Sequence, residues 1–323
     1  MKFKSLLAIL SVLTILFLAA CGNNNEQDDQ AAEKENEGNK TEDTSYTVEH
    51  AMGTTTLEKT PEKVVILTNE GTEALLSMGI TPVGAVQSWT GDPWYEHIAD
   101  DMKDVQVVGT ESEVNVEAIA ALQPDLIIGN KMRQEKIYDQ LNDIAPTIFA
   151  ETLRGNWKEN FELYAKAINK EEDGQKVIAD YDSRIEEIKT NLGDKLSQEV
   201  SIVRFMAGDV RIYHKDSFSG VILDQIGLAR PESQNVDDFA EKNATKERIP
   251  AMDGDVLFYF TYETGDGEAS QLEKEWIEDP LFKNLKVAQE GNVYQVSDTI
   301  WNTAGGVISA NLLLDDIEKY LVK

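Results

Sequence analysis

The stretch NVEAIAALQPDLIIG, residues 115–129, decides the fold of this chain. Its first part, 115–122, has the apolar spacing of a short helix, and Pro124 ends that helix because proline cannot continue it. The second part, 125–129, is a continuous apolar run, which is typical of a strand buried on both faces. A helix followed by such a strand predicts an α/β fold with a mainly parallel sheet covered by helices.

The flanking segments repeat this alternation of strand and helix. Strands are predicted at 64–67, 82–86 and 146–149, and helices at 70–78 and 134–141. In the second half, strands are predicted at 200–205, 210–213, 255–261 and 292–296, and helices at 220–226, 273–277 and 307–321. The pattern therefore predicts two α/β halves.

A long helical segment separates the two halves. Residues 157–192 contain no proline, and their apolar residues recur at helical intervals. A pause near 171–174 leaves open a kink or a split at Gly174. We interpret 156–194 as a bridging helix between a first lobe, 46–155, and a second lobe, 195–323.

The first twenty residues have the pattern of a signal peptide. Lys2 and Lys4 precede an uncharged apolar run over 6–20, which is short for a membrane-spanning helix. The run ends directly before Cys21, the one cysteine in the chain. This junction resembles the lipobox of bacterial lipoproteins, which implies cleavage before Cys21 and a lipid on its sulfur. An ordinary signal peptide with an incidental cysteine is the alternative.

Residues 22–45 carry eight acidic and two basic side chains and no Ile, Leu, Val or aromatic residue. Such a composition cannot bury enough apolar surface to fold, so we expect 21–45 to be a lipidated cysteine followed by a disordered tether.

Composition excludes several classes of function. The 323 residues carry a formal charge of −29, which argues against nucleic-acid binding. One cysteine rules out a disulfide framework within the chain and a cysteine-based zinc site. With 41% hydrophobic residues the chain can form a core.

Three segments together resemble the iron-siderophore substrate-binding lipoproteins of bacterial ABC importers. They are 61–84, 115–129, and Trp301-Asn302-Thr303-Ala304-Gly305-Gly306 before the last helix. The resemblance covers about 46–323. Within the family, the sequence looks closest to Gram-positive receptors for citrate-based or hydroxamate siderophores.

The resemblance implies a class III substrate-binding protein, with two Rossmann-like lobes bridged by one long helix and a ligand in the cleft between them. It implies a monomer that is lipid-anchored on the extracellular face of a Gram-positive cell membrane. Such a receptor would deliver a ferric siderophore to an ABC permease with a cytoplasmic ATPase. The implied protein is not an enzyme and has no cofactor, because the siderophore itself holds the iron.

Arginines gather where a ligand would lie. Ligands of parallel sheets bind beyond the carboxyl ends of the strands, and four of the seven arginines lie at such ends or in the loops that follow them: Arg133, Arg154, Arg204 and Arg211. Arginine binds carboxylates in bidentate fashion, so an anionic, carboxylate-bearing siderophore is expected. Further ligand-binding candidates are Lys131, Trp89, Trp94, Tyr213, Trp301 and Asn302.

The family resemblance also implies one acidic residue on each lobe that pairs with arginines of the permease. The matching positions are Glu117 and Glu247. The alternative is that each acid only stabilises the start of a helix through the helix dipole.

Three other functions were weighed. A haem or corrinoid ligand of the same fold would need an axial residue, for which Tyr213 or Met206 could serve. A bare-metal receptor is disfavoured because no His, Asp and Glu cluster has ligand spacing. An extracellular hydrolase is disfavoured because the chain has no Gly-x-Ser-x-Gly motif.

Overall fold

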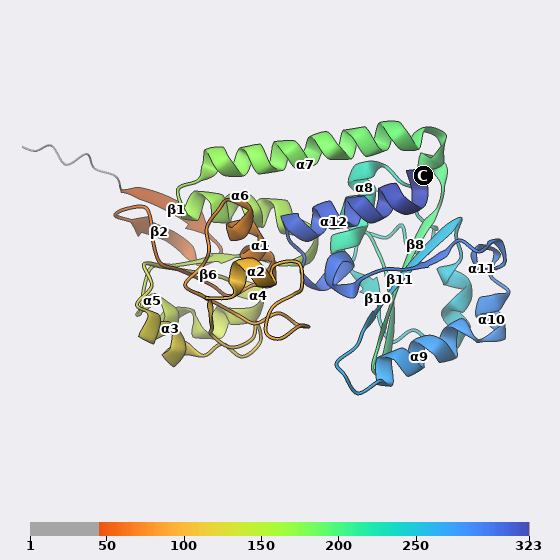
Figure 1. Ribbon diagram of the computed structural model, residues 1–323, viewed down its shortest axis with the longest axis horizontal. Helices are drawn as coiled ribbons and strands as arrows, with labels where there is room; N and C mark the ends of the chain where they lie inside the picture. Colours follow the sequence, from red (N-terminus) through yellow and green to blue (C-terminus); the bar gives the residue numbers. More distant parts are fainter. Residues whose placement is uncertain (1–44, 323) are drawn as a thin grey trace, which may run out of the picture. The chain divides into compact units, whose positions relative to one another are not determined.

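The computed structural model describes residues 45–322, which form two α/β lobes joined by a long helix (Figure 1). The predicted signal segment, Cys21 and nearly all of the tether lie outside the described residues.

The first lobe is built on a parallel sheet. Its strands are β3 (Val64–Ile66), β4 (Gly84–Ala85), β5 (Gln106–Val107), β6 (Leu126–Asn130) and β7 (Thr147–Ala150). They lie in the order β5-β4-β3-β6-β7, and every neighbouring pair is parallel. The helices are α1 (Asn69–Ser77), α2 (Ala99–Met102), α3 (Val116–Leu122), α4 (Lys131–Gln134), α5 (Tyr138–Asn142) and α6 (Trp157–Ala167).

Local signals in the sequence explain where these elements begin and end. The Thr68 side chain accepts a hydrogen bond from the backbone N–H of Gly71 and caps α1, and Gly79 follows the helix with a φ of +74°. The Asn115 side chain caps α3 in the same way. All residues of β6 are buried, which confirms the strand predicted from the apolar run.

Two segments of the first lobe differ from the prediction. The helix predicted at 134–141 is divided into α4, a short 3-10 turn over Glu135–Ile137, and α5, and it begins earlier because the Asn130 side chain caps α4. An antiparallel hairpin of β1 (Tyr46–His50) and β2 (Gly53–Leu57) was not predicted. These strands are threonine-rich or partly exposed, so they lack the apolar run that marks a buried strand.

The second lobe has a mixed sheet. Its strands are β8 (Val200–Met206), β9 (Asp209–Tyr213), β10 (Ala240–Glu241), β11 (Val256–Tyr262) and β12 (Val293–Gln295), in the order β10-β9-β8-β11-β12. Strands β8, β11 and β12 are parallel, whereas β9 is antiparallel to both of its neighbours. The helices are α8 (Phe218–Ile226), α9 (Glu268–Ile277), α10 (Pro280–Lys283), α11 (Lys286–Glu290) and α12 (Val307–Ile317).

The helix that crosses between the lobes is α7 (Glu171–Leu192), and it spans about 33 Å at 1.5 Å per residue. The predicted helix is therefore split, but the break falls just before the predicted pause, after α6, where Asn169 has a φ of +55°. Gly174 lies inside α7 and does not interrupt the helix. A Cβ there would lie 2.7 Å from the Cβ of Ala165, so glycine lets α6 and α7 approach closely.

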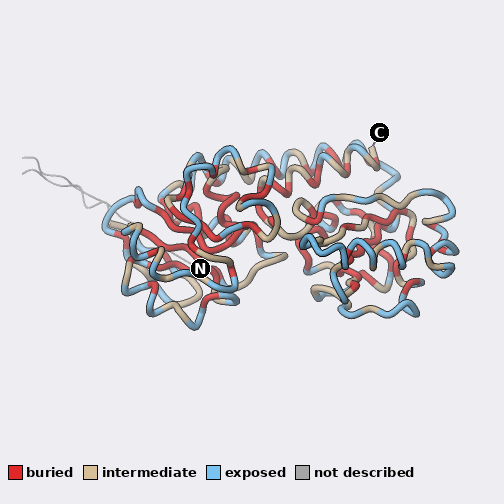
Figure 2. Tube along the Cα trace, turned by 60° about the horizontal axis from the view of Figure 1, so that its bottom comes forward, coloured by how far each residue is buried: buried red, intermediate tan, exposed pale blue. Residues whose placement is uncertain are grey.

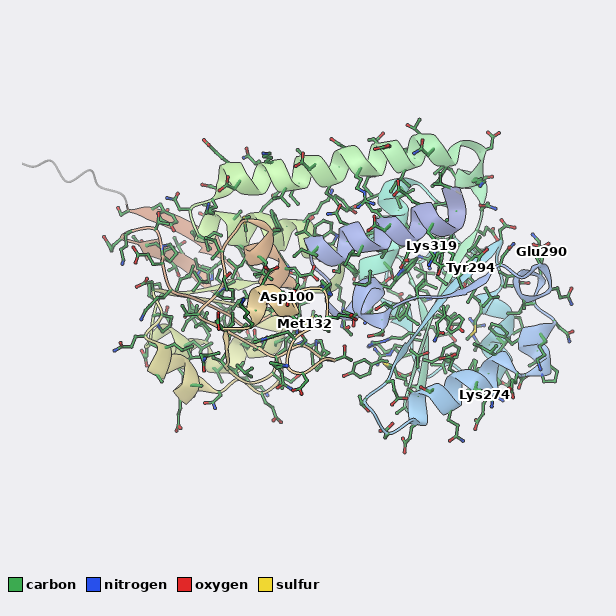
Figure 3. The ribbon with its side chains drawn as sticks, viewed as in Figure 1. Asp100, Met132, Lys274, Glu290, Tyr294 and Lys319 are labelled. Atoms are coloured by element: carbon green, nitrogen blue, oxygen red, sulfur yellow. The ribbon has the colours of Figure 1, made fainter. Side chains whose placement is uncertain are left out.

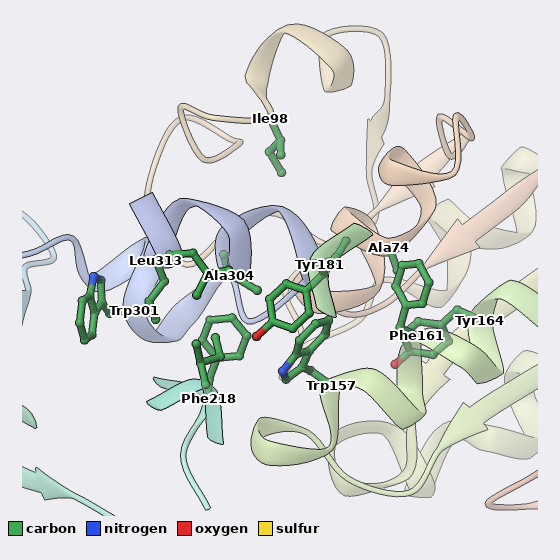
Figure 4. Close-up of a cluster of buried hydrophobic side chains, with 14 of the residues drawn as sticks. Ala74, Ile98, Trp157, Phe161, Tyr164, Tyr181, Phe218, Trp301, Ala304 and Leu313 are labelled. Atoms are coloured by element: carbon green, nitrogen blue, oxygen red, sulfur yellow. The ribbon is translucent and has the colours of Figure 1, made fainter. Parts of the chain in front are cut away.

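The lobes share a hydrophobic core. Buried backbone concentrates inside each lobe (Figure 2), and one cluster of buried side chains contains residues from β3, α7 and β8 alike. At its centre, the indole of Trp157 packs edge-on against Tyr181 and Phe218, with ring centroids 5.0 and 6.3 Å apart (Figure 4). These three rings come from α6, α7 and α8. The two lobes are therefore joined by a packed hydrophobic interface as well as by the connecting chain.

The charge predicted from composition lies largely on the outside. Figure 3 shows Lys274 on α9 and Glu290 on α11 at the surface of the second lobe, and both are exposed. Charged side chains in such positions are solvated by water.

Candidate ligand-binding site

A cavity of about 430 Å³ is lined by residues of both lobes. On the first-lobe side the lining residues are Glu70, Trp89, Glu111, Arg133, Leu153 and Arg154. On the second-lobe side they are Arg204, Met206, Arg211, Phe218, Phe239, Lys242 and Tyr262, together with residues 302–305. Four arginines and one lysine therefore surround a single space.

Arg204 is the most rigidly held of these cations. It lies on β8, is 6% exposed, and its Nε and Nη2 donate to the two carboxylate oxygens of Asp298 over 2.6 and 3.2 Å. Its Nη1 donates to the hydroxyl of Tyr213 over 3.3 Å, and its guanidinium lies 4.9 Å from the ring centroid of Tyr262. A bidentate pair fixes the orientation as well as the position of the charge.

Arg211 faces the same side of the sheet as Arg204. The two residues are direct partners in the antiparallel pairing of β8 and β9, and like charges in directly opposed positions are destabilising. Arg211 donates from its Nε to Asp209 over 2.7 Å. The sheet accommodates two opposed arginines because each has its own acid, and both side chains line the cavity.

The arginines of the first lobe are held more loosely. The Nε of Arg133 lies 3.7 Å from a carboxylate oxygen of Glu111, and its guanidinium lies 5.6 Å from the ring centroid of Trp89. Arg154 has a φ of +82°, rare for a residue with a side chain, and its guanidinium lies 4.2 Å from the ring centroid of Phe239. Arg154 therefore makes a cation–π contact across the cavity.

Six of the predicted ligand-binding residues line this cavity: Trp89, Arg133, Arg154, Arg204, Arg211 and Asn302. The other four do not line the cavity: three are buried aromatic residues, and one is a lysine paired with an acid. Tyr213 and Trp301 are fully buried: the Tyr213 hydroxyl supports Arg204, and the Trp301 indole donates to Asp316 over 2.9 Å. Trp94 is buried in the hydrophobic core that the lobes share, and Lys131 pairs with Glu151 over 2.8 Å.

One of the three arginines outside the predicted set is also buried. Arg230 is 8% exposed, and its guanidinium donates to the carbonyl oxygens of Val200 and Tyr213 and to Gln234. Burial lowers its pKa to about 10. A buried charge requires such partners, and the local sequence does not show that these groups surround Arg230.

Sequence reasoning missed several residues of the cavity. Glu70 follows β3, Glu111 follows β5, and Tyr262 ends β11. The rule that ligands lie beyond the carboxyl ends of strands points to Glu70 and Tyr262, which come after predicted strands. It does not point to Glu111, because the sequence gives no strand signal at β5. Lys242 and Phe239 come from the segment around β10, which has no strand signal in the sequence.

The segment after Trp301 joins the two lobes at the cavity. Residues 303–305 line the cavity, and a Cβ at Gly306 would lie 2.7 Å from the Glu73 side chain of α1. Glu73 accepts hydrogen bonds from the backbone N–H and the hydroxyl of Ser309, over 2.8 and 3.0 Å, and also contacts His97. The first lobe thus caps the start of α12.

The two residues expected to meet a permease are both exposed. Glu117 lies in the first turn of α3, and Glu247 lies in the 3-10 segment Lys246–Met252.

Within residues 45–322 no cluster of three or more His, Cys, Asp or Glu side chains is placed to hold a metal ion. In the same part of the chain, no helix combines the length and the apolar character that crossing a membrane requires.

Fold and cavity define a class of protein in which two α/β lobes, joined by a helix, enclose a ligand site. The sequence model described as periplasmic binding protein matches residues 64–299. This chain belongs to the periplasmic binding protein family, whose members are binding proteins and not enzymes, as the sequence predicted.

The names of the similar proteins refer to siderophores or to ferric citrate. The chain is 51% identical to the probable siderophore-binding lipoprotein YfiY of Bacillus subtilis, over 100% of this chain and 99% of that protein. It is 30% identical to the Fe(3+)-citrate-binding protein YfmC of the same organism, over 98% and 97%. The crystal structure of Staphylococcus aureus SirA complexed with staphyloferrin B is 34% identical, with a TM-score of 0.81 over 85% of this chain and 98% of that one. These comparisons confirm the predicted fold class.

Proposed function

We propose that this protein captures a ferric siderophore in the cavity between its lobes and delivers it to an ABC permease for iron uptake. The observation that carries the proposal is the opposed pair Arg204 and Arg211, each held by its own acid, facing a cavity of about 430 Å³. A ferric siderophore presents an oxygen-rich and often negative surface. Fixed guanidinium groups bind such oxygens without ligating the iron.

The siderophore class that fits best is a carboxylate-bearing one, such as a citrate–hydroxamate. The relatives named above bind ferric citrate and staphyloferrin B, and the cavity lining combines five cationic side chains with Trp89, Phe239 and Tyr262. Aromatic rings supply broad and stiff apolar contact beside the charged groups.

Fluorescence quenching tests this function directly, because Trp89 lines the cavity. We expect ferric staphyloferrin B or ferric dicitrate to quench with a submicromolar Kd, and a neutral ferric trihydroxamate to bind more weakly. Failure of every ferric chelate to bind below micromolar concentrations would refute the proposal. A Soret band that shifts on titration with haem would instead favour a haem receptor; of the two axial residues considered from the sequence, Met206 lines the cavity.

Delivery to the permease is proposed to use Glu117 and Glu247, one exposed acid on each lobe. The double variant Glu117→Ala, Glu247→Ala is expected to abolish uptake of the radiolabelled ferric chelate by cells and to leave its Kd unchanged. The matched control is Glu172→Ala, Glu187→Ala, which removes two exposed acids of α7. Loss of affinity in the first variant, or equal loss of uptake in both, contradicts the assignment.

The membrane anchor is proposed to be a lipid on Cys21, with 21–45 as tether between the membrane and the lobes. Replacing Cys21 with alanine is expected to shift the protein from the membrane fraction to the culture medium. Equal membrane retention of this variant and the unchanged protein would argue for another anchor. The proposed lobes are 46–155 and 195–323, with 156–194 bridging them.

A further inference from the structure

The first-lobe side of the cavity contains an acid that an anion-binding site does not by itself explain. Glu70 lines the cavity and is 5% exposed. It lies in the first turn of α1, directly after β3. An ionised carboxylate in this place would repel an anionic ligand, and a buried charge without a cation is costly.

The hydrogen bonds of Glu70 are distributed unevenly over its two oxygens. Asn160 donates from its side-chain amide to Oε1 over 2.8 Å, and the hydroxyl of Tyr164 donates to the same oxygen over 3.2 Å. Both donors come from α6. Among residues 45–322 the structure assigns no hydrogen bond to Oε2. One oxygen is thus a doubly satisfied acceptor, and the other is left for a proton.

The charged and titratable groups around Glu70 do not neutralise it. On its own helix Glu73 is bound to Ser309 and His97, and from the loop after β5 Glu111 faces both Asn69 and Arg133. From α6 comes the hydroxyl of Tyr164. Arg133 of α4 approaches Glu111, and none of the described residues forms an ion pair with Glu70.

We propose that Glu70 contacts the ligand as a neutral carboxylic acid, whose Oε2 hydroxyl donates a hydrogen bond to a negatively charged oxygen of the bound ferric chelate. The inference rests on the proposed function and deepens it. The second lobe would hold ligand oxygens with guanidinium charges, whereas the first lobe would offer them a protonated acid. Burial, with smaller contributions from Glu111 and Glu73, holds the pKa of Glu70 well above its ordinary range, although Asn160 and Tyr164 oppose the shift.

This arrangement links affinity to pH. A neutral Glu70 binds an anion, and an ionised Glu70 repels it, so the bound state retains the proton to higher pH than the free state. Affinity for the ferric chelate is therefore constant below the pKa of Glu70 in the free protein. It falls by up to about tenfold per pH unit above that value, until Glu70 ionises in the complex as well.

The test compares Glu70→Gln with the unchanged protein, using ferric staphyloferrin B and ferric dicitrate between pH 6 and pH 9. Glutamine is nearly isosteric, remains neutral and keeps a donor at the Oε2 position. We expect its Kd at pH 6 to lie within about threefold of the unchanged protein, and its affinity to fall less as pH rises. Glu70→Ala, which lacks the donor, is expected to bind about tenfold more weakly at pH 6. The chelate and every other side chain are the same in all of these measurements, so the difference between the variants reports on Glu70.

Glu159→Gln is the matched control, because Glu159 is an exposed acid in the first turn of α6. It should behave as the unchanged protein. A second readout needs no ligand: the infrared carbonyl band of a protonated carboxyl group should be present at neutral pH and be reduced in Glu70→Gln.

Three results would overturn the inference. They are tighter binding by Glu70→Gln at pH 6, parallel pH profiles for this variant and the unchanged protein, and an infrared band that does not change. If the unchanged protein binds no ferric chelate, the proposed function fails as well. If it binds one and any of the three results is found, only the role of Glu70 fails.

Discussion

The two sides of the cavity are built in different ways. In the second lobe the charges project from paired strands, and Arg204 and Arg211 face each other across β8 and β9 with Asp298 and Asp209 beside them. In the first lobe the cavity residues lie on loops and at helix starts, as Glu70 does. The sheets explain the contrast. In the first sheet, which is parallel throughout, the cavity residues come from the connections, whereas in the second sheet β8, β9 and β11 themselves carry cavity residues.

The contrast shows that the second lobe holds its cavity charges rigidly, whereas the first lobe holds them more loosely. Strand residues held by neighbouring acids, of which Asp298 is buried, are oriented before the ligand arrives, which reduces the entropy lost on binding. Side chains such as Arg133, 39% exposed, can adjust to ligands of different shape. We therefore expect the second lobe to supply most of the affinity and the first lobe to supply more of the selectivity.

Removing Arg204 is expected to have the largest effect. Arg204→Ala deletes a ligand-facing charge and leaves Asp298 buried without its partner, so we expect unfolding in urea to show a loss of about 3–5 kcal/mol. Affinity for the ferric chelate should fall about a hundredfold or more. The control is the double variant Arg204→Met, Asp298→Leu, which should regain stability but not affinity. A stability of Arg204→Ala equal to that of the unchanged protein would contradict the claim that this side is locked.

A substitution at Glu73 tests the contact between α1 of the first lobe and the start of α12. Glu73→Ala removes the acceptor for two hydrogen bonds of Ser309 and for the contact with His97. We expect a loss of about 2–3 kcal/mol, since hydrogen bonds to charged groups contribute about 1.5–3 kcal/mol each and the freed groups regain some water. Glu172→Ala, an exposed first-turn acid of α7, should change the free energy of unfolding by less than about 0.5 kcal/mol. Equal stability of the two variants would show that the lobes do not depend on this contact.

Arg211 should give the smallest effect of the three on stability. Its side chain is 24% exposed and its partner Asp209 reaches solvent, so Arg211→Ala should cost less than about 1 kcal/mol in stability. Affinity should fall about tenfold, because a charge-assisted contact is lost. Arg248→Ala, which breaks an exposed pair with Glu241 outside the cavity, is the control for affinity. If Arg211→Ala destabilises as much as Arg204→Ala, the difference in burial between the two pairs is not what sets their contributions.

Much of the fold could be predicted because its signals are local. A continuous apolar run marked β6, and Pro124 marked the end of the helix before it. Elements without such signals were missed, as with the hairpin of β1 and β2. The break before α7 was displaced from Gly174 to Asn169, because a glycine that permits close helix packing and a glycine that ends a helix look alike in sequence.

The ligand-binding residues were predicted from their positions relative to strands and not from their side-chain contacts. Arg133, Arg204 and Arg211 were identified because they lie at the ends of predicted strands or in the segments that follow them, and all three line the cavity. Tyr213 and Trp301 have equally suggestive positions but are fully buried. Whether an aromatic side chain faces a cavity or the core depends on which neighbours cover it, and that is not a local property.

The sequence by itself determined the family, the two lobes with their bridging helix, and the gathering of arginines near strand ends, because periodicity, caps and strand position are properties of short segments. The tertiary structure alone decided which acids hold those arginines and where an acid faces the ligand without a cation. Arg204 meets Asp298 across 94 residues, and Glu70 meets Asn160 across 90. Such contacts depend on strand register and lobe packing, which bring together groups that no local pattern connects.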